Sequence, residues 1–275
     1  MWAFAKGHGT KNDFVLLTDE HDTLAPTDAQ VRFLCDRRAG IGGDGLLRAV
    51  RARHITGWQG DPDVWFMDYR NADASVAEMC GNGLRVFLRY LVEEGLASGP
   101  DIAVGTRAGS RHGEVRPDGT VRVTMGRVRT QPEPVTVALG DRSWPAHGAN
   151  VGNPHAVVIV GGEDELDALN LERAPQITPN GAFPAGVNVE FVQLVAARHA
   201  RMRVFERGAG ETLSCGTGTV AVAAILAQRG GVGDSTWRID VPGGSLGVEL
   251  TAEGAWLSGP AVIVARGLVS VPQVG

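Results

Sequence analysis

The chain has 275 residues, of which 43% are hydrophobic and 21% charged, and its formal net charge at pH 7 is −5. This length suits one large domain or two modest ones, and the negative charge argues against nucleic acid or an anionic membrane as a partner. The first residues lack the hydrophobic region of a signal peptide, and no apolar run reaches the roughly 18 residues of a membrane span. We therefore expect a cytoplasmic protein.

The first half of the chain is expected to form several strands and two helices. A helix-like segment runs from Ala29 to Arg38, and a second helix is expected after Cys80. Gly40-Ile-Gly-Gly-Asp-Gly45 matches the dinucleotide pattern G-x-G-x-x-G, but it follows a helix and leads into a strand, the reverse of the required order. Alternating or β-branched runs predict strands at Phe14–Leu17, Val64–Tyr69, Ile102–Val104 and Val121–Met125.

The second half repeats this organisation after a proline-containing stretch, Arg129–Gly148, which is expected to hold a connection although it includes the strand-like Val135–Leu139. The segment Val220–Leu226 has almost no polar face and must be buried on most sides, which predicts a sheet curled around a central helix. The predicted strands are His155–Val160, Val187–Leu194, Arg201–Phe205, Trp237–Val241 and Ser245–Leu250.

One motif occurs twice. Cys80 stands in Met79-Cys-Gly-Asn-Gly and Cys215 in Ser214-Cys-Gly-Thr-Gly, and each opens an apolar run that closes on a glycine fifteen positions later. A polar residue stands nine positions before each cysteine, Asn71 in the first copy and Glu206 in the second. The chain is therefore a duplicated unit, and each half contributes one thiol.

Each copy of the motif favours a reactive thiol. A Cys-Gly-x-Gly turn that feeds a helix places the sulfur beside N–H groups without intrahelical partners, at the positive end of the helix dipole. A thiolate or a substrate carboxylate is stabilised there. A single cysteine before a helix is more often a small buried hydrophobe, but two matched copies favour reactivity. Cys35 has no counterpart in the repeat and is expected to be a packing thiol.

Other residues carry weaker signals. Gly152-Asn-Pro-His opens an apolar strand with polar groups, although an Asn-Pro turn can account for Asn153 without any function. The three cysteines show no Cys-x-x-Cys spacing, so neither a disulfide framework nor a zinc site is indicated. We expect no metal and no cofactor.

Together the motifs resemble those of diaminopimelate epimerases, which work without pyridoxal phosphate. The resemblance runs from about residue 3 to Gly267. It implies an α/β fold of two pseudo-symmetric domains, each a curled, mostly antiparallel sheet around a central helix, with residues 1–125 and a C-terminal strand, 263–275, in the first and residues 126–262 in the second. It also implies a homodimer. The matching stretches are Lys6-Gly-His-Gly-Thr-Lys-Asn-Asp-Phe14, Asn71-Ala-Asp, Met79-Cys-Gly-Asn-Gly, Gly152-Asn-Pro-His, Val187-Asn188, Glu206-Arg-Gly-Ala-Gly-Glu-Thr212 and Ser214-Cys-Gly-Thr-Gly.

Carried over by position, the resemblance implies that Cys80 and Cys215 are the acid/base pair for the epimerisation of LL-diaminopimelate to the meso form, in lysine and peptidoglycan-precursor synthesis. His155 and Glu206 would tune the protonation of the thiols. One departure is Gly45, where many members of the family carry a glutamine, so a side-chain contact to substrate is lost or replaced there. The implied substrate-binding residues are Asn12, Asn71, Gly81, Asn82, Asn153, Asn188, Glu206, Arg207, Gly216 and Thr217.

Two alternatives stay open. The same fold can act on another amino acid, as in proline racemases, which generally show a histidine near the position of Asn82, or in phenazine-type isomerases, which lack the two-cysteine pair. A non-catalytic redox switch of Cys80 and Cys215 accounts for the thiols but not for the asparagines, Arg207 or the glycines at the helix starts.

Overall fold

The computed structural model describes residues 1–131 and 133–272 and divides into two compact units. The N-terminal unit comprises Met1–Val123 and the segment from Gly259 onward, and the C-terminal unit comprises Thr124–Ser258. Residues 273–275, which end the segment expected to join the first half, lie outside the described residues. That each unit is an independent domain with the boundaries expected from the sequence stays a prediction.

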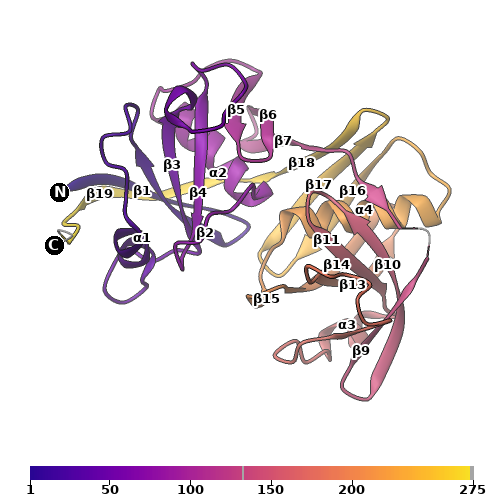
Figure 1. Ribbon diagram of the computed structural model, residues 1–275. Helices are drawn as coiled ribbons and strands as arrows, with labels where there is room; N and C mark the ends of the chain where they lie inside the picture. The colour runs from indigo at the N-terminus through magenta and orange to yellow at the C-terminus, as the bar shows by residue number, and fades with distance from the viewer. Residues whose placement is uncertain (132, 273–275) are drawn as a thin grey trace. The chain divides into compact units, whose positions relative to one another are not determined.

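The N-terminal unit is a sheet curled around helix α2 (Figure 1). Most of its strand pairs are antiparallel, whereas β2 pairs with β3, and β4 with β5, in parallel. The last strand, β19, pairs with the first, β1. The elements are β1 Trp2–Gly9, β2 Asn12–Thr18, α1 Asp28–Cys35, β3 Gly45–Arg51, the 3₁₀ helix Ala52–His54, β4 Trp65–Asn71, α2 Gly81–Glu93, β5 Ile102–Thr106, β6 Gly109–Val115, β7 Thr120–Gly126 and β19 Val262–Val269.

The C-terminal unit has the same plan around helix α4. Strands β10, β11, β13, β16 and β17 pack against α4, so the sheet encloses this helix on most sides. The elements are β8 Arg129–Thr130, β9 Val135–Leu139, β10 Arg142–Asn150, β11 Pro154–Ile159, α3 Glu163–Asp167, β12 Gln176–Thr178, β13 Asn188–Ala196, β14 His199–Glu206, β15 Gly210–Thr212, α4 Gly216–Arg229, β16 Ser235–Val241, β17 Gly244–Thr251 and β18 Gly254–Pro260. The expected sheet around a central helix is thus confirmed in both units.

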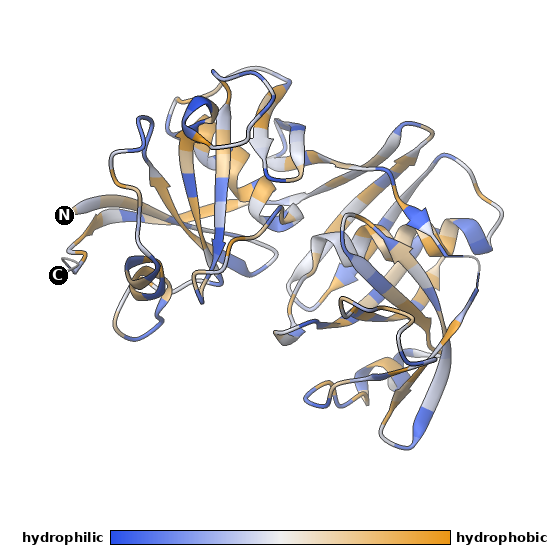
Figure 2. Cartoon of the chain, viewed as in Figure 1, coloured by the Kyte–Doolittle hydropathy of each residue, from blue (hydrophilic) through white to orange (hydrophobic). Residues whose placement is uncertain are grey.

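The two central helices differ in one respect that matters for the site. Helix α4 is apolar along almost its whole length, as the orange ribbon in Figure 2 shows, and its first charged residue is Arg229 at its end. Helix α2 is equally buried but carries Arg85 in its first turns, and this side chain is fully buried at 0% exposure. A buried cation therefore lies near the start of one helix and has no counterpart in the other.

Two expectations about elements need correction. The stretch Arg129–Gly148 is mostly strand, because β9 and β10 form an antiparallel hairpin in which Pro145 pairs with Thr136. The helix expected to reach Arg38 ends at Cys35. Asp36 is extended there, and its carboxylate accepts the N–H groups of Arg38 and Ala39 at 2.7 Å, a local hydrogen-bonding pattern that competes with helix continuation.

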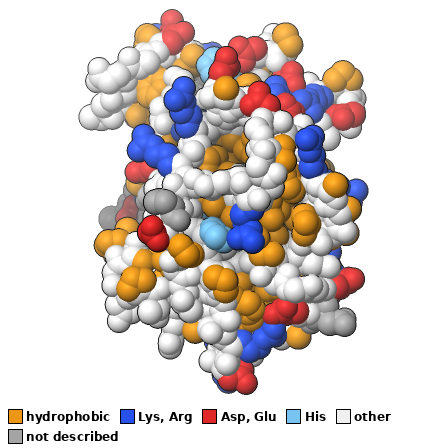
Figure 3. All heavy atoms as spheres, turned by 90° about the vertical axis from the view of Figure 1, so that its right-hand side faces the viewer, with side chains coloured by type: hydrophobic (Ala, Val, Ile, Leu, Met, Phe, Trp, Pro, Cys, Tyr) orange, Lys and Arg blue, Asp and Glu red, His pale blue; other side chains and the backbone are white. Residues whose placement is uncertain are grey.

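The surface carries both signs of charge. On the face shown in Figure 3, basic and acidic side chains are interspersed with hydrophobic ones. Within the described residues, no helix is both long enough and apolar enough to cross a membrane.

Candidate functional site

Cys80 is the N-cap of α2. Its backbone is extended, with φ −137° and ψ 124°, and its sulfur accepts the Gly83 N–H at 3.4 Å. The first intrahelical bond runs from the Leu84 N–H to the Cys80 carbonyl at 2.8 Å. The N–H groups of Gly81 and Asn82 belong to the first turn of α2, where backbone donors point out of the start of the helix. They lie where an anion beside the sulfur would be stabilised.

Two asparagines, Asn12 and Asn82, lie beside this thiol. Asn12, the first residue of β2, places its Oδ1 3.7 Å from the Cys80 sulfur and also accepts the Asn82 Nδ2–H at 3.2 Å. The Asn12 Nδ2 donates to Asp44 at 2.6 Å, which fixes the orientation of the amide. Asn71 lies at the end of β4, where its Nδ2 donates to Ser75 at 2.9 Å. We call Cys80, Asn12, Asn82 and Arg85 the Cys80 cluster.

Cys215 has the same position on α4 but different neighbours. Its sulfur accepts the Gly218 N–H at 3.4 Å and lies 3.5 Å from Thr217 Oγ1, and the residue is 5% exposed. Burial raises the pKa of the Cys215 thiol well above its usual value, and the charges of Glu206 and Glu190 raise it further. Its surroundings therefore favour the thiol form over the thiolate. Cys215, His155, Glu190 and Glu206 form the Cys215 cluster.

His155 and Glu190 form a buried pair behind Cys215. His155 Nδ1 lies 2.7 Å from Glu190 Oε1, both side chains are 0% exposed, and His155 Nε2 lies 2.9 Å from Asn153 Oδ1. Gly218 makes this arrangement possible, because a Cβ there would lie 2.5 Å from Glu190 Oε1. Glu190 was not identified as a site residue from the sequence. The available signal was a carboxylate between the apolar residues of a strand, β13.

Glu206 and Arg207 follow each other at the end of β14. Burial and the charge of Glu190 raise the pKa of Glu206, while hydrogen bonds from Thr212 and Cys215 lower it. The Arg207 backbone N–H donates to Asn188 Oδ1 at 2.9 Å, and its guanidinium is exposed and donates to the Ala185 carbonyl. Among residues 1–131 and 133–272, Arg207 makes no salt bridge that would mark it as an ordinary surface ion pair.

The structure thus assembles the expected residues as two clusters of matching design, one in each unit. Asn12, Gly81 and Asn82 lie around Cys80. His155, Asn153, Asn188, Glu206, Gly216 and Thr217 lie around the start of α4 and the adjoining strand ends, together with Arg207. Asn71 is at the end of its strand but bonded to Ser75. The catalytic and binding roles of these residues stay predictions.

The structure leaves no space at Gly45 for the glutamine whose absence was noted from the sequence. A Cβ on this glycine would lie 2.6 Å from the Arg70 carbonyl oxygen and 2.7 Å from Tyr69 Cε2. Because the nearest atom belongs to the backbone of β4, a side chain requires the two strands to move apart.

Cys35 packs in the core, as expected. It is 4% exposed and lies in a cluster with Val15, Leu34 and Leu46. Burial raises the pKa of its thiol to about 11. The glycine-rich segment from Gly40 forms the loop between α1 and β3, so it does not have the strand–turn–helix order of a dinucleotide site.

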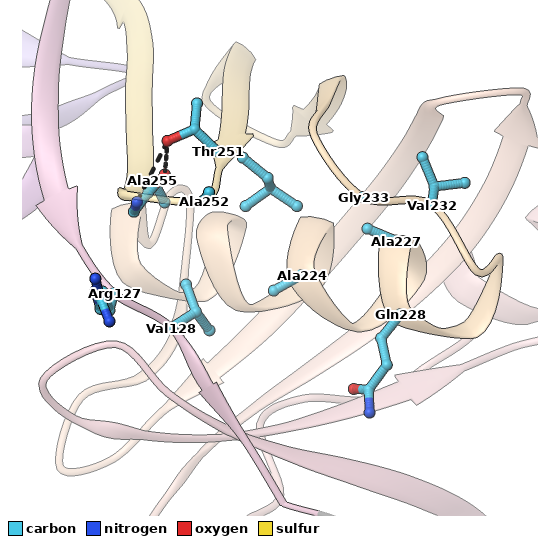
Figure 4. Close-up of a pocket in the computed structure, with 12 residues that line it drawn as sticks. Arg127, Val128, Ala224, Ala227, Gln228, Val232, Gly233, Thr251, Ala252 and Ala255 are labelled. Atoms are coloured by element: carbon cyan, nitrogen blue, oxygen red, sulfur yellow. Dashed lines mark hydrogen bonds between the residues drawn. The ribbon is translucent and has the colours of Figure 1, made fainter.

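A separate hollow lies along the later turns of α4 (Figure 4). It encloses about 310 Å³ between Ala224, Ala227 and Gln228 of the helix and the turn from Leu250 to Ala255. Cys215 is at the opposite end of this helix, on the order of 18 Å away at 1.5 Å per residue. The hollow is therefore distinct from the Cys215 cluster.

The chain matches a family model described as diaminopimelate epimerase over residues 4–131 and 148–271. It is 50% identical over 275 residues to diaminopimelate epimerase from Streptomyces coelicolor, with 96% of this chain and 94% of that protein covered. Identity to the enzyme of the same name from Thermobifida fusca is 50%, covering 96% of each chain, and to that from Corynebacterium glutamicum 44%, covering 98% of each.

Solved structures share the fold at much lower identity. A Bacillus anthracis protein of the PhzF family has a TM-score of 0.71 at 14% identity, covering 98% of this chain and 99% of that one. A probable proline racemase from Agrobacterium radiobacter has a TM-score of 0.70 at 18% identity, covering 99% and 94%. The family resemblance drawn from the motifs is confirmed, and the chain belongs to the diaminopimelate epimerase family.

Proposed function

We propose that this chain interconverts LL- and meso-diaminopimelate without pyridoxal phosphate or a metal. The observation that supports this most directly is the pair of matched cysteine caps, each with its sulfur 3.4 Å from the N–H of the third helical residue, in a member of the diaminopimelate epimerase family. In this mechanism the two thiols would act on opposite faces of the substrate's α carbon.

Stabilising the negative charge is the main chemical difficulty. The α proton of an amino acid is very weakly acidic, and without an imine the electron pair released from the C–H bond must be held by the substrate's own carboxylate. The N–H groups at the starts of α2 and α4 are fixed hydrogen-bond donors. Their interaction with the substrate carboxylate becomes stronger as negative charge develops on it. Arg207 is exposed and planar, and it would add a bidentate contact to a substrate carboxylate.

The proton then moves between two sulfurs. One cysteine, as thiolate, takes the α proton from one face while the other, as thiol, gives its proton to the opposite face. The first ends as thiol and the second as thiolate, so their roles exchange with the direction of reaction. The two titrate as a coupled pair if a single substrate joins them. Glu206 and the His155–Glu190 pair would set the protonation of Cys215, since both carboxylates raise the pKa of this thiol.

The alternatives are less well supported. The likeness to a probable proline racemase rests on 18% identity and concerns the fold, whereas the named epimerases reach 50% over nearly the whole chain. Asn82 also occupies the position where proline racemases generally carry a histidine. A redox switch would need only the two thiols and leaves the Asn12–Asn82 hydrogen bond beside Cys80 without a purpose.

We also propose a homodimer that works in the cytoplasm, where thiols are kept reduced. Strand β19 exposes apolar side chains that a second copy of the chain would cover: Val262 is 43%, Val264 55% and Leu268 65% exposed. Light scattering should give twice the chain mass, and Val264→Glu should shift the protein toward monomer. A monomeric wild-type protein would contradict the proposal.

The decisive experiment is turnover in heavy water. Purified protein with no additions should convert LL-diaminopimelate to the meso form and place deuterium at the α carbon that reacts, because a thiol exchanges its proton with solvent. Mass spectrometry of the product gives both results. Activity that requires pyridoxal phosphate, or that a chelator abolishes, would refute the proposal.

A further inference from the structure

The two clusters carry opposite charge, although they derive from a duplicated unit. Asn71 stands nine positions before Cys80, where Glu206 stands before Cys215. Phe14 contacts the second glycine of the first motif, with its Cζ 3.4 Å from a Cβ built on Gly83. At the corresponding glycine of the second motif, Gly218, a built Cβ would lie 2.5 Å from Glu190 Oε1. Two carboxylates beside Cys215 are thus replaced by neutral groups beside Cys80.

A third matched position adds a cation to the first cluster. Arg85 follows Cys80 by five positions, and Val220 follows Cys215 by five. Helical side chains point back toward the N-terminus, and Arg85 Nη1 accordingly reaches the Gly81 carbonyl at 3.3 Å. Its Nη2 donates to Thr10 Oγ1 at 3.3 Å, and within the described residues its buried Nε has no hydrogen-bond partner.

This position is unfavourable for an isolated cation. Arg85 is 0% exposed, it makes no salt bridge among the described residues, and it lies at the positive end of the α2 dipole. A buried charge requires a counterion to offset the loss of hydration. An anion at the start of the helix would offset both the loss of hydration of Arg85 and its repulsion by the helix dipole. The Cys80 sulfur lies at that position.

We propose that Arg85 is the buried countercharge of a Cys80 thiolate, so that in the resting protein Cys80 is the thiolate and Cys215 is the thiol. The proposal rests on the two-cysteine function above and assigns which sulfur begins as the base. Arg85 touches no substrate in this account. It is a positioning residue that acts through Cys80.

The charge interactions of each group agree with this assignment. Burial lowers the pKa of Arg85 to about 10, and the interaction with Cys80 opposes that decrease. By reciprocity, the guanidinium favours the ionised sulfur to the same extent. The pKa of Cys215 is instead raised by burial, Glu206 and Glu190, and the hydrogen bond between Cys215 and Glu206 lowers the pKa of the carboxyl group.

Other charged groups near α2 are directed elsewhere. Gly7 and Gly9 of β1 face the helix, and a Cβ on Gly9 would lie 3.1 Å from Arg85 Nη2, so Lys6 and His8 lie on the opposite face of this strand. Phe14 of β2 faces the helix, and Asp13 therefore lies on the opposite face, where it pairs with Lys6.

On the remaining strands around α2, two arginines pair with carboxylates, and a third faces the second half of the helix. Arg48 of β3 pairs with Asp19 and Asp68, and Arg266 of β19 pairs with Glu93 and Glu94 at the far end of the helix. Arg111 of β6 shares the face of Gly113, which abuts Leu88 in the second half of α2. Only Cys80 interacts electrostatically with Arg85 among the described titratable groups.

One contact works in the opposite direction. The Cys80 sulfur donates to Asn12 Oδ1 at 3.7 Å, and this bond exists only in the thiol form. It is long for a hydrogen bond, whereas the Gly83 N–H donates to the sulfur in either form. We expect the full buried charge of Arg85 to outweigh this weak contact.

Alkylation kinetics test the assignment directly. The wild-type protein is treated with iodoacetamide across a pH series, and peptide mass spectrometry follows Cys80 and Cys215 separately. Cys80 should react with the lower apparent pKa. Arg85→Met keeps the bulk and removes the charge, so it should raise that pKa by one unit or more and slow alkylation of Cys80 at pH 7 about tenfold. Arg85→Lys should restore most of the rate.

Matched controls separate electrostatics from misfolding. Cys215 should keep its profile in the Arg85 variants, and Glu206→Gln should lower the pKa of Cys215 and leave that of Cys80 unchanged. One test uses the wild-type protein alone and so does not depend on the folding of a variant. If the pKa of Cys215 is lower than that of Cys80 in this protein, the proposal is overturned. An unchanged Cys80 profile in folded Arg85→Met would also overturn it.

Turnover of the same preparation distinguishes the two proposals. If the wild type epimerises diaminopimelate but Cys80 does not respond to Arg85, this inference fails alone. If the alkylation order is as expected and no epimerisation occurs, the proposed function fails and the charge assignment of the two thiols stands.

Discussion

Gly218 and Gly83 are the same residue of the duplicated motif, and alanine at the two positions should have opposite effects. A Cβ on Gly218 would lie 2.5 Å from Glu190 Oε1 and 3.2 Å from its Cγ and Cδ. A Cβ on Gly83 would meet its nearest neighbours, Phe14 and Cys80, at 3.4 and 3.5 Å, which is ordinary contact. Each glycine is the third residue of its helix and has a helical backbone.

The magnitude follows from comparing the two variants. Replacing a helical glycine by alanine stabilises by about 0.5–1 kcal/mol, and this gain is common to both. Only Gly218→Ala also overpacks a core, at a cost of about 1–3 kcal/mol. Glu190 cannot retreat freely, because its Oε1 is held 2.7 Å from His155 Nδ1 with both side chains buried. We therefore expect Gly218→Ala to be less stable than Gly83→Ala by about 1–3 kcal/mol.

Thermal unfolding and the pH dependence of Cys215 alkylation measure the effect. At roughly 2–4 °C per kcal/mol, the Tm of Gly218→Ala should lie several degrees below that of Gly83→Ala. Gly218→Ala should also alter the pH profile of Cys215, because displacing Glu190 changes the charge around this thiol. Equal Tm values for the two variants would refute the close approach of Glu190 to α4.

Three further predictions concern single side chains. Cys80→Ala and Cys215→Ala should each abolish epimerisation in a coupled turnover assay, while Cys35→Ala keeps most of it; equal loss in all three would contradict the assignment. Arg207→Lys keeps the charge but loses the planar guanidinium, so kcat/KM should fall at least tenfold. Near-normal kinetics would show that Arg207 does not bind a substrate carboxylate in a bidentate manner. The raised pKa of Cys35, about 11 against 9.0, means that its contribution to stability is complete below pH 9 and lost as the pH rises through 11. Urea denaturation across this range should show a loss of up to about 3 kcal/mol that Cys35→Ala lacks.

Much of the fold could be read from hydrophobic patterning. The predicted strands and the two helices after Cys80 and Cys215 are all present, because β-branched runs and helical apolar spacing are local signals. The hairpin of β9 and β10 was harder to predict, since Pro145 and nearby polar residues weaken the strand pattern. Pairing with β9 overrides this local preference.

The site shows the same division between local and long-range information. The cysteine caps could be predicted from the motif, because an N-cap is fixed by the few residues that follow it. Glu190 and Arg85 were not found, because each stands between apolar neighbours in its element, and only the folded structure shows what faces it. A lone charge inside a buried element is nevertheless a signal that sequence reading can use, since such a charge is rarely buried without a partner.

The differences between the two halves are those that the proposed two-base reaction requires. Two identical clusters would give the two thiols the same affinity for a proton, and a large share of the protein would then hold two thiols or two thiolates, neither of which can catalyse proton transfer across a carbon. A buried guanidinium beside Cys80 and two carboxylates beside Cys215 bias the pair toward one thiolate and one thiol. The bias must stay moderate, because the opposite distribution has to form whenever the reaction runs in reverse. Asn12 Oδ1 beside the Cys80 sulfur provides such moderation, since it accepts the proton of the thiol form that the reverse reaction needs.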